Sequence, residues 1–510
     1  MNLAQLWQKQ AAQYGDKTFL YFGDDEYSYN QMLGTFYRVA DSLAGLGVAK
    51  GDRVALMHRN APEFLYTWFA LSFLGAITVP INPVFTETEI AYILGHSGAK
   101  ALVIEQEFLE TLGKVSREQT PELGQVIVSG GQAPEGTIPF ARLMLGAERD
   151  PGVAIDDQDP CVCIYTSGTT DMPKGVLNSH YGWVTTGQAY VYTVGIGEND
   201  RVMTPNPLFH ANAQVYSTMG SLNAGAGLIL LERFSGSQIL EQARRYQATK
   251  MVLVQAVTPW VWGRPVSADD CEHNLDTMVA GNVPVDIYEK FEERFCLKIQ
   301  TIYSLTEATM AVMGPRPGTM PRKPGSIGVP MEHPDPAVTN RVWIADEAGR
   351  ELPAGKQGEI IINNPAVMLG YYNDPAKTAA TKIDGWVHTG DIGFRDEEGY
   401  IFFVGRKKEV IRRRGELISP TQIEAVLNAH PAVAESAVIG VPSELGTGEE
   451  EVKAFVRLEE GGQATAEELQ EFCRAKLAEF KVPRFIEFRS EFAKSAIGRI
   501  KKEELKKSNP

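Results

Sequence analysis

The sequence reads Tyr165-Thr166-Ser167-Gly168-Thr169-Thr170-Asp171-Met172-Pro173-Lys174-Gly175 directly after the apolar run Cys161–Ile164. An apolar run followed by hydroxyl side chains and glycine predicts a buried strand that ends in a polar loop. Hydroxyls and backbone N–H groups on such a loop can surround phosphate oxygens, and Lys174 can add a positive charge. The Walker A spacing is absent, and taken alone the segment fits an ordinary surface turn equally well.

Outward from this loop, the chain alternates between β-rich and helical stretches. Strands are predicted at residues 53–56, 101–104, 125–128 and 251–254, and a helix at residues 31–46. This alternation predicts α/β layers with largely parallel strands that are buried on both faces. Because 510 residues exceed the size of a single core, we expect a large multilayered N-terminal domain with parallel-rich sheets and a second, smaller domain.

The C-terminal fifth of the chain differs in composition from the rest. Residues 405–510 contain 19 Lys+Arg and 18 Asp+Glu, whereas the whole chain carries a net charge of -15. Strands are predicted at 436–441 and 452–458, and a helix between Thr465 and Phe480, where Thr465 and Glu468 form a capping-box pattern. We therefore predict domains at 1–407 and 408–510, the second a small, mobile α+β domain.

Composition also limits the classes of function. The strong negative charge argues against a general nucleic-acid binder, because no global positive field attracts phosphate backbones. The five cysteines are few and odd in number, so we expect reduced thiols rather than a disulfide framework. The first residues lack the pattern of an export signal, which predicts a cytoplasmic protein.

One uncharged segment, residues 64–86, is long enough to raise the question of a membrane span. Gly75, Pro80 and Pro83 interrupt it. We predict instead an amphipathic helix at residues 63–74 that leads into a short strand at residues 77–81, and we expect this helix to be buried in the core and not to span a membrane.

Five further blocks follow the loop, and they are Pro207-Leu208-Phe209-His210, Gly281-Asn282-Val283-Pro284, Tyr303-Ser304-Leu305-Thr306-Glu307, Trp386-Val387-His388-Thr389-Gly390-Asp391 and Gly405-Arg406-Lys407-Lys408. In order and spacing they resemble the adenylate-forming enzymes, a family that includes acyl-CoA synthetases, luciferases and peptide-synthetase adenylation domains. The resemblance covers nearly the whole chain. It is closest to crotonobetaine/carnitine-CoA ligases, through stretches such as 224–226, 231–235, 316–318, 411–416 and 480–483.

The resemblance implies roles for individual residues. It implies nucleotide binding by Thr166, Ser167, Gly168, Thr169, Thr170, Gly281, Asn282, Val283, Tyr303 and Ser304, with Tyr303 along the adenine, and by Asp391 and Arg406 at the ribose. It implies catalytic roles for Lys174, His210, Thr306, Glu307 and Arg499, with Glu307 and Thr306 holding Mg²⁺ and the α-phosphate and His210 bordering the acyl pocket. Lys408 matches the family's domain hinge, and Gly415 a glycine beside the pantetheine channel of coenzyme A.

Two positions depart from the family pattern. Asp171 stands where glycine is usual, which places a carboxylate near the phosphates. Arg499 replaces the adenylation lysine; it keeps the positive charge, although its planar guanidinium is not equivalent to an ammonium. We expect Arg499 to serve in preference to Lys501 or Lys502, which would need a shift in register.

The sequence therefore predicts an ATP-dependent carboxylate:CoA ligase, an acid-thiol ligase that uses ATP, Mg²⁺ and coenzyme A and acts on a small or medium organic acid. For a carnitine-like or betaine-like acid, Trp260 and Trp262 are candidates to face the quaternary ammonium. Two alternatives stay open, an adenylating enzyme that loads a carrier protein and a nucleotide-binding protein impaired in adenylation. A homodimer also stays open.

Overall fold

The structure is a computed structural model, and it describes residues 1–166, 172–253, 258–281, 283–413, 416–443, 450–494 and 500–507. The chain folds into two compact units. The first unit comprises residues 1–342 and 362–388, and the second comprises residues 343–361 and 389–510. The predicted boundary at 407/408 stays a prediction.

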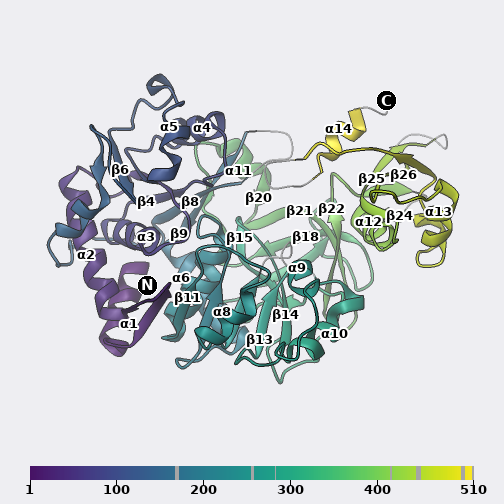
Figure 1. Ribbon diagram of the computed structural model, residues 1–510, viewed down its shortest axis with the longest axis horizontal. Coiled ribbons are helices and arrows are strands. Elements are labelled where there is room, and N and C mark those ends of the chain that lie inside the picture. Colours follow the sequence, from purple (N-terminus) through teal and green to yellow (C-terminus); the bar gives the residue numbers. More distant parts are fainter. Residues whose placement is uncertain are drawn as a thin grey trace. The chain divides into compact units, whose positions relative to one another are not determined.

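An eight-stranded sheet in the first unit contains the strand that precedes the predicted phosphate-binding loop (Figure 1). Its order is β19 (Gly370–Tyr371), β9 (Lys174–Ser179), β8 (Pro160–Thr166), β4 (Ile77–Pro80), β3 (Arg53–Met57), β5 (Ala101–Glu105), β6 (Gln125–Ser129) and β7 (Ile138–Pro139). The six strands from β8 to β7 are parallel, whereas β9 runs antiparallel to β8 and β19 antiparallel to β9. The predicted strands at 53–56, 101–104 and 125–128 are confirmed.

A nine-stranded sheet forms the other half of this unit. Its order is β16 (Val329–Pro330), β15 (Ala308–Met313), β14 (Lys298–Leu305), β13 (Thr277–Ala280), β12 (Lys250–Leu253), β10 (Arg201–Thr204), β11 (Gly227–Leu230), β1 (Thr18–Phe22) and β2 (Asp25–Ser28). The run from β14 to β1 is parallel, and the flanking strands β15, β16 and β2 are antiparallel. Parallel strands buried on both faces account for the apolar runs in the sequence.

Helices fill the space against these sheets. The first unit contains α1 (Leu3–Tyr14), α2 (Tyr29–Gly45), α3 (Pro62–Leu74), α4 (Glu87–Ser97), α5 (Leu109–Leu112), α6 (His180–Val194), α7 (Met219–Ala224), α8 (Ile239–Arg245), α9 (Thr258–Trp262), α10 (Val285–Phe295) and α11 (Pro375–Thr381). One continuous core joins α1, α2, α3, α6 and α7 to residues of both sheets. This is the predicted α/β architecture, and it holds the carboxyl ends of both sets of parallel strands in one unit.

Helix α3 corrects one expectation. Pro62 begins the helix, and Gly75 ends it in the left-handed region at φ 65°. All of its residues except Glu63 are buried, so the predicted core helix is confirmed, whereas the predicted amphipathic pattern is wrong because α3 is buried around its whole circumference. Across the described residues, the structure contains no helix with both the length and the apolar character that a membrane crossing requires.

A third sheet is cut by the boundary between the units. It contains β17 (Arg341–Ala345), β18 (Gly358–Asn363), β21 (Trp386–Arg395) and β20 (Lys382–Ile383), with β22 (Ile401–Arg406) paired to β21. The second unit then continues through β23 (Ile411–Arg413), β24 (Glu416–Ile418), α12 (Pro420–Asn428), β25 (Val433–Pro442), β26 (Glu450–Leu458), α13 (Ala466–Arg474), β27 (Phe485–Phe488) and α14 (Lys502–Lys507). The capping box is confirmed, because Thr465 and Glu468 exchange backbone-to-side-chain hydrogen bonds of 2.8 and 3.1 Å.

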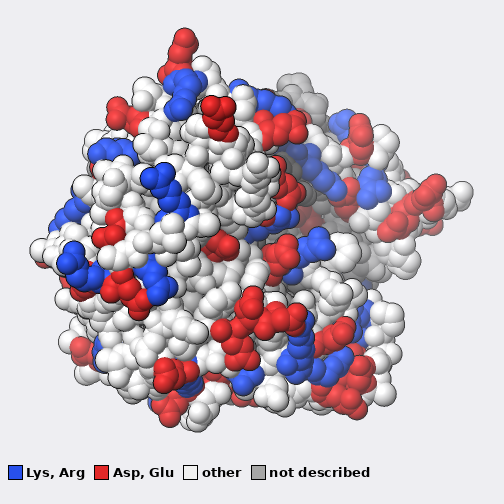
Figure 2. Space-filling model, turned by 60° about the vertical axis from the view of Figure 1, so that its left-hand side comes forward, with Lys and Arg blue, Asp and Glu red and all other residues white. Residues whose placement is uncertain are grey.

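The cysteines correct a second expectation. Cys271 and Cys296 form a disulfide across 25 residues of sequence, with Cα atoms 5.3 Å apart, whereas Cys161, Cys163 and Cys473 are free and buried. Sequence spacing held no sign of this pair, because the fold alone brings the loop before β13 to the end of α10. Over the described surface visible in Figure 2, acidic and basic side chains are intermixed.

Candidate active site

Strands β8 and β9 form a hairpin, and the predicted phosphate-binding loop lies between them in the sequence. Thr166 ends β8, Lys174 begins β9, and the two are register partners across the antiparallel pair. Both are partly exposed, whereas the preceding residues Cys161–Tyr165 are buried. The predicted phosphate-binding residues Ser167, Gly168, Thr169 and Thr170, and also Asp171, lie outside the described residues. The structure therefore holds the two ends of the loop together at the edge of the buried sheet.

A second hairpin presents the predicted Mg²⁺ ligand. Leu305 of β14 pairs with Ala308 of β15, so Thr306 and Glu307 form the two-residue connection between these strands. Residues 303–307 are partly exposed, whereas Ala308–Met313 are buried throughout. Glu307 is therefore partly exposed next to a buried strand, and its carboxylate is accessible.

One segment, residues 368–372, links the two hairpins. The Tyr371 hydroxyl donates to Glu307 Oε1 at 2.8 Å, and the Met368 N–H donates to the Glu307 carbonyl oxygen at 2.9 Å. On its other side this segment pairs as β19 with β9, and the Tyr372 N–H donates to the Gly175 carbonyl oxygen at 2.7 Å. The strand that begins at Lys174 and the turn that carries Glu307 are therefore tied to the same short stretch of chain.

Tyr371 is a functional candidate that the sequence analysis missed. Burial, and next the neighbouring Glu307 carboxylate, raise the pKa of Tyr371, so its hydroxyl stays protonated and donates to the carboxylate. A hydrogen bond from a fixed hydroxyl orients the carboxylate oxygen that accepts it. Groups that hydrogen-bond to metal ligands commonly orient them in this way. The only signal in the sequence is Gly370-Tyr371-Tyr372, which by itself does not distinguish a site residue from a core residue.

Three other predicted motifs lie at the carboxyl ends of the parallel strands in the nine-stranded sheet. Strands β10, β12, β13 and β14 are parallel, so the segments that follow β10 and β13 and the final residues of β14 lie at the same edge. These are the segment with His210, the segment with Gly281 and Val283, and the pair Tyr303 and Ser304. Ligands of open α/β sheets bind at this edge. Asn282 lies outside the described residues, and the Val283 side chain is buried in the core.

His210 is solvent-exposed, and its ring centroid lies 4.6 Å from that of Phe209. Desolvation by the surrounding protein nevertheless lowers the pKa of His210, which favours a neutral imidazole at neutral pH. A neutral ring can accept or donate a hydrogen bond beside a substrate carboxylate without adding a fixed charge.

A π-helical turn, Ala213–Thr218, follows His210 and was also missed. Such turns are rare and are frequent at functional sites. Gln214 and Ser217 are fully buried in it, and Ser217 Oγ has no hydrogen-bond partner among the described residues. A buried hydroxyl without a partner is costly, and a polar group of a ligand could satisfy it.

The second unit contains the predicted ribose pair. Asp391 on β21 is register partner of Arg406 on β22, and Arg406 Nε lies 2.8 Å from Asp391 Oδ1. Asp391 is buried, whereas Arg406 is exposed. The predicted hinge Lys408 lies exposed in the turn after β22, and its carbonyl oxygen accepts from the Lys506 ammonium at 3.2 Å. Gly415 and Arg499 lie outside the described residues.

The donor set fits magnesium at Glu307. Among the described residues, no group of three or more His, Cys, Asp or Glu is arranged to hold a metal ion. Mg²⁺ does not need such a cage, because it keeps several waters and binds one or two carboxylates together with substrate phosphates. One oriented, accessible carboxylate at Glu307 meets that requirement.

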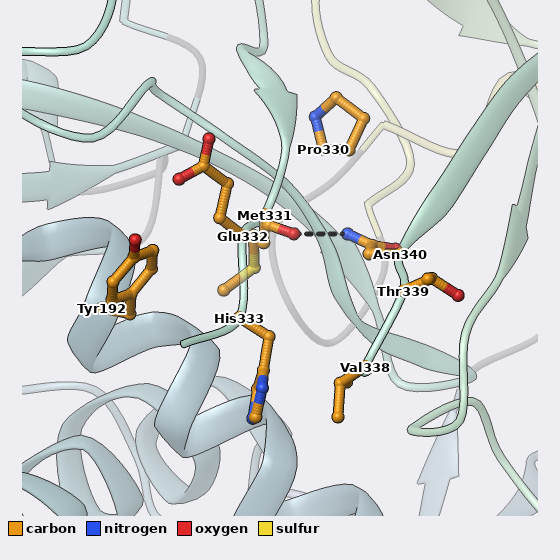
Figure 3. Close-up of a pocket in the computed structure, with 8 residues that line it drawn as sticks. All are labelled: Tyr192, Pro330, Met331, Glu332, His333, Val338, Thr339 and Asn340. Atoms are coloured by element: carbon orange, nitrogen blue, oxygen red, sulfur yellow. Dashed lines mark hydrogen bonds between the residues drawn. The ribbon is translucent and has the colours of Figure 1, made fainter. Parts of the chain in front are cut away.

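A shallow surface pocket of about 420 Å³ lies elsewhere in the first unit (Figure 3). Its lining includes Tyr192, Glu332, His333 and Asn340, whose amide donates to the Met331 carbonyl oxygen at 3.2 Å. None of the residues predicted to bind nucleotide lines it. We therefore place the candidate active site at the strand ends described above.

The two tryptophans proposed for a quaternary ammonium differ in environment. Trp262 stacks on Phe291, and the Arg294 guanidinium already lies 5.5 Å from the centre of its ring. This cation occupies the position a betaine would take, so Trp262 is better explained as a structural residue. Trp260 is 71% exposed and remains available.

Comparison with known proteins gives a consistent result. Residues 7–372 match the AMP-binding enzyme family, and residues 422–499 match the AMP-binding enzyme C-terminal domain. The chain is 34% identical to the crotonobetaine/carnitine–CoA ligase of Salmonella paratyphi C (strain RKS4594), with 99% of each chain covered.

Two solved structures are similar over the full length. The anthranilate CoA ligase AuaEII in complex with anthranoyl-AMP has a TM-score of 0.88 and 27% identity, covering 100% of this chain and 97% of the other. ATP-bound MatB from Rhodopseudomonas palustris has a TM-score of 0.86 and 25% identity, covering 100% of this chain and 99% of the other.

Proposed function

The chain belongs to the AMP-binding enzyme family, and we propose that within it the acid substrate is a small, polar carboxylate of the carnitine or crotonobetaine type. The class of reaction is that of an AMP-forming acid-thiol ligase. ATP, Mg²⁺ and coenzyme A are its partners in the reaction. The observation that carries the site assignment is the segment 368–372, which ties the Glu307 turn to the strand that begins at Lys174.

In the first half-reaction, a carboxylate oxygen of the acid bonds to the α-phosphorus of ATP and pyrophosphate leaves. We propose that Thr166, Lys174 and the loop between them bind the phosphates. Hydroxyl groups there can donate hydrogen bonds to the phosphate oxygens, and the Lys174 ammonium can offset their negative charge. Mg²⁺, when bound at Glu307, neutralises charge that accumulates on the departing pyrophosphate. Tyr371 acts as a positioning residue, because it fixes one oxygen of that carboxylate.

In the second half-reaction, the thiolate of coenzyme A attacks the acyl carbon and AMP leaves. We assign Asp391 and Arg406 to the ribose, Lys408 to the hinge between residues 1–407 and 408–510, and Gly415 to the pantetheine channel. Arg499 takes the place of the family's adenylation lysine. The buried carboxylate of Asp391 beside an exposed guanidinium supports the ribose assignment, since it can accept from two hydroxyls at once.

Three observations support a polar acid. The relative at 34% identity is named for crotonobetaine and carnitine. Ser217 supplies a buried hydroxyl that has no partner among the described residues, in the turn after His210. Trp260 supplies an exposed aromatic ring. A quaternary ammonium can lie on such a ring, and a hydroxyl or carboxylate can meet the serine.

Acid-dependent AMP release in the presence of coenzyme A tests this proposal. Carnitine, crotonobetaine, short-chain, aromatic and dicarboxylic acids would be compared, and we expect the two betaines to have the highest kcat/KM. A preference for aromatic acids would refute the substrate class and leave the ligase class intact. The Trp260→Ala variant should lose activity with betaines more than with butyrate, and Trp262→Phe is the matched control.

Two other assignments have separate tests. Consumption of coenzyme A without an added carrier protein distinguishes the ligase from an enzyme that loads a carrier. Acid-dependent exchange of pyrophosphate into ATP distinguishes it from a nucleotide-binding protein impaired by Asp171 and Arg499. We also propose that the ligase acts in the cytoplasm, without a nucleic-acid partner, and as a monomer or homodimer; the net charge of -15 supports the absence of nucleic acid.

A further inference from the structure

The Cys271–Cys296 disulfide is exposed, whereas the three free cysteines are not. Both half-cystines lie at the surface of the first unit. Cys161, Cys163 and Cys473 are buried, and burial raises the pKa of each of these thiols, that of Cys473 to about 11. Thiol oxidation and disulfide reduction require access to a thiolate. Redox chemistry of this chain is therefore confined to the one exposed pair.

The disulfide closes a loop that contains one complete structural unit. Between Cys271 and Cys296 lie β13, the residues Gly281, Val283 and Pro284 that follow it in the sequence, and α10. Because β13 and the following strand β14 are parallel, α10 runs back along the sheet, and Cys296 sits at its left-handed C-cap. The disulfide therefore lies at the amino ends of the strands. Gly281 and Val283, which the family resemblance predicts to bind nucleotide, lie at the carboxyl ends, about 15 Å away along the strand and helix.

This geometry couples the two ends through a rigid helix. The disulfide fixes the C-terminal end of α10, and the N-terminal end of α10 follows directly after the buried Val283 and then Pro284. A tilt of α10 about its packed face would shift Pro284 and Val283, which precede the helix. The disulfide at the C-terminal end of α10 opposes that tilt.

Arg294 limits how large the effect can be. Its guanidinium donates to Asp270 Oδ2 at 2.8 Å and to the carbonyl oxygens of Trp262 and Arg264 at 2.7 and 2.9 Å. These bonds join α10 to the same loop that Cys271 follows, and they are independent of redox state. Reduction should therefore loosen the helix end without releasing it, and we expect a change of several-fold, not a loss of binding.

We propose that Cys271 and Cys296 form a reversible redox pair, and that the disulfide form of this chain binds ATP more tightly than the dithiol form. The inference rests on the proposed function, because it needs Gly281 and Val283 to lie at the nucleotide. The co-reactant is a small-molecule disulfide. One protein thiolate attacks it and releases one small thiol, and the second protein thiolate displaces the other, so two protein thiols become one disulfide and one disulfide becomes two thiols.

The test compares two forms of the full chain. One sample is treated with oxidised glutathione and the other with reduced dithiothreitol, and each is then alkylated with iodoacetamide without denaturation. Mass spectrometry should find no label on the first and two labels on the second, at Cys271 and Cys296. ATP binding is then measured by calorimetry with MgCl₂ and without any acid, and we expect the alkylated form to bind about fivefold more weakly, at the lower end of typical coupling between sites.

The variant with both Cys271→Ser and Cys296→Ser serves as the matched control. It should bind ATP as the reduced chain does and should not respond to dithiothreitol, and its far-UV circular dichroism should match the wild type. Equal ATP affinity of the oxidised, reduced and double-serine forms overturns the proposal and leaves the ligase assignment standing. Labelling at neither cysteine after reduction also overturns it. Failure of both forms to bind ATP overturns the ligase assignment and this proposal together.

Discussion

Replacing Tyr371 with phenylalanine tests the part of the site that no sequence motif revealed. The substitution removes one hydroxyl and keeps the ring, so the packing of the segment 368–372 against β9 should persist. What is lost is the hydrogen bond of 2.8 Å to Glu307 Oε1. If Glu307 binds Mg²⁺, its carboxylate then turns more freely and presents a poorer ligand.

The magnitude follows from the chemistry of that bond. A hydrogen bond to a charged group contributes about 1.5–3 kcal/mol, which corresponds to about 10- to 150-fold in rate. Removal of partners behind metal ligands costs about 10- to 100-fold. Glu307 is partly exposed, so water can replace the hydroxyl in the variant. We therefore expect the lower end, a loss of about tenfold in kcat/KM for the first half-reaction, near 1.4 kcal/mol.

The assay is pyrophosphate exchange into ATP at a series of Mg²⁺ concentrations, with the acid that the substrate panel identifies. Tyr371→Phe should raise the Mg²⁺ concentration required for half-maximal exchange, and added Mg²⁺ should recover part of the rate. Thioester formation from supplied acyl-adenylate should change less than about twofold, because it does not require this metal.

Tyr372→Phe provides the matched control. Its ring packs against His96 and lies near the Arg53 guanidinium. This variant should keep the wild-type Mg²⁺ dependence. The reasoning is refuted if Tyr371→Phe and Tyr372→Phe lose exchange activity equally, or if Tyr371→Phe slows both half-reactions by the same factor.

Three further variants probe the site and its support. Glu307→Gln should slow pyrophosphate exchange more than Tyr371→Phe does, and an equal loss in thioester formation from supplied adenylate would contradict the metal assignment. Lys174→Ala should raise KM for ATP about tenfold or more while Lys174→Arg recovers part of the loss, a result expected of a charge that holds phosphate; unchanged KM in both would exclude that role. Burial lowers the pKa of His180 to about 4, so the unfolded chain takes up this proton first, and stability is lost as the pH falls from about 6.5 towards about 4, by at most about 3 kcal/mol. Urea unfolding at several pH values should show a smaller loss for His180→Gln, and parallel curves for the two proteins would exclude the effect.

The local sequence determined the elements and their chemistry. Apolar runs bounded by polar residues predicted β3, β5 and β6 to within a residue or two, because a strand buried on both faces needs an uninterrupted apolar run. The apolar run 161–164 was placed correctly in β8, which ends at Thr166, and Thr465 and Glu468 form the expected capping box. These signals depend on neighbours in the chain, so no knowledge of the fold was required.

Only the tertiary structure decided which residues meet. Tyr371 contacts Glu307 across 64 residues, and Cys271 reaches Cys296 across 25. Each of these facts depends on how sheets and helices pack, and the amino-acid pattern around Tyr371 or Cys271 is the same whether or not the partner is near. The sequence by itself thus predicted the chemistry at the strand ends, and folding decided which partners orient those residues, because a side chain's environment is set mainly by residues distant in the chain.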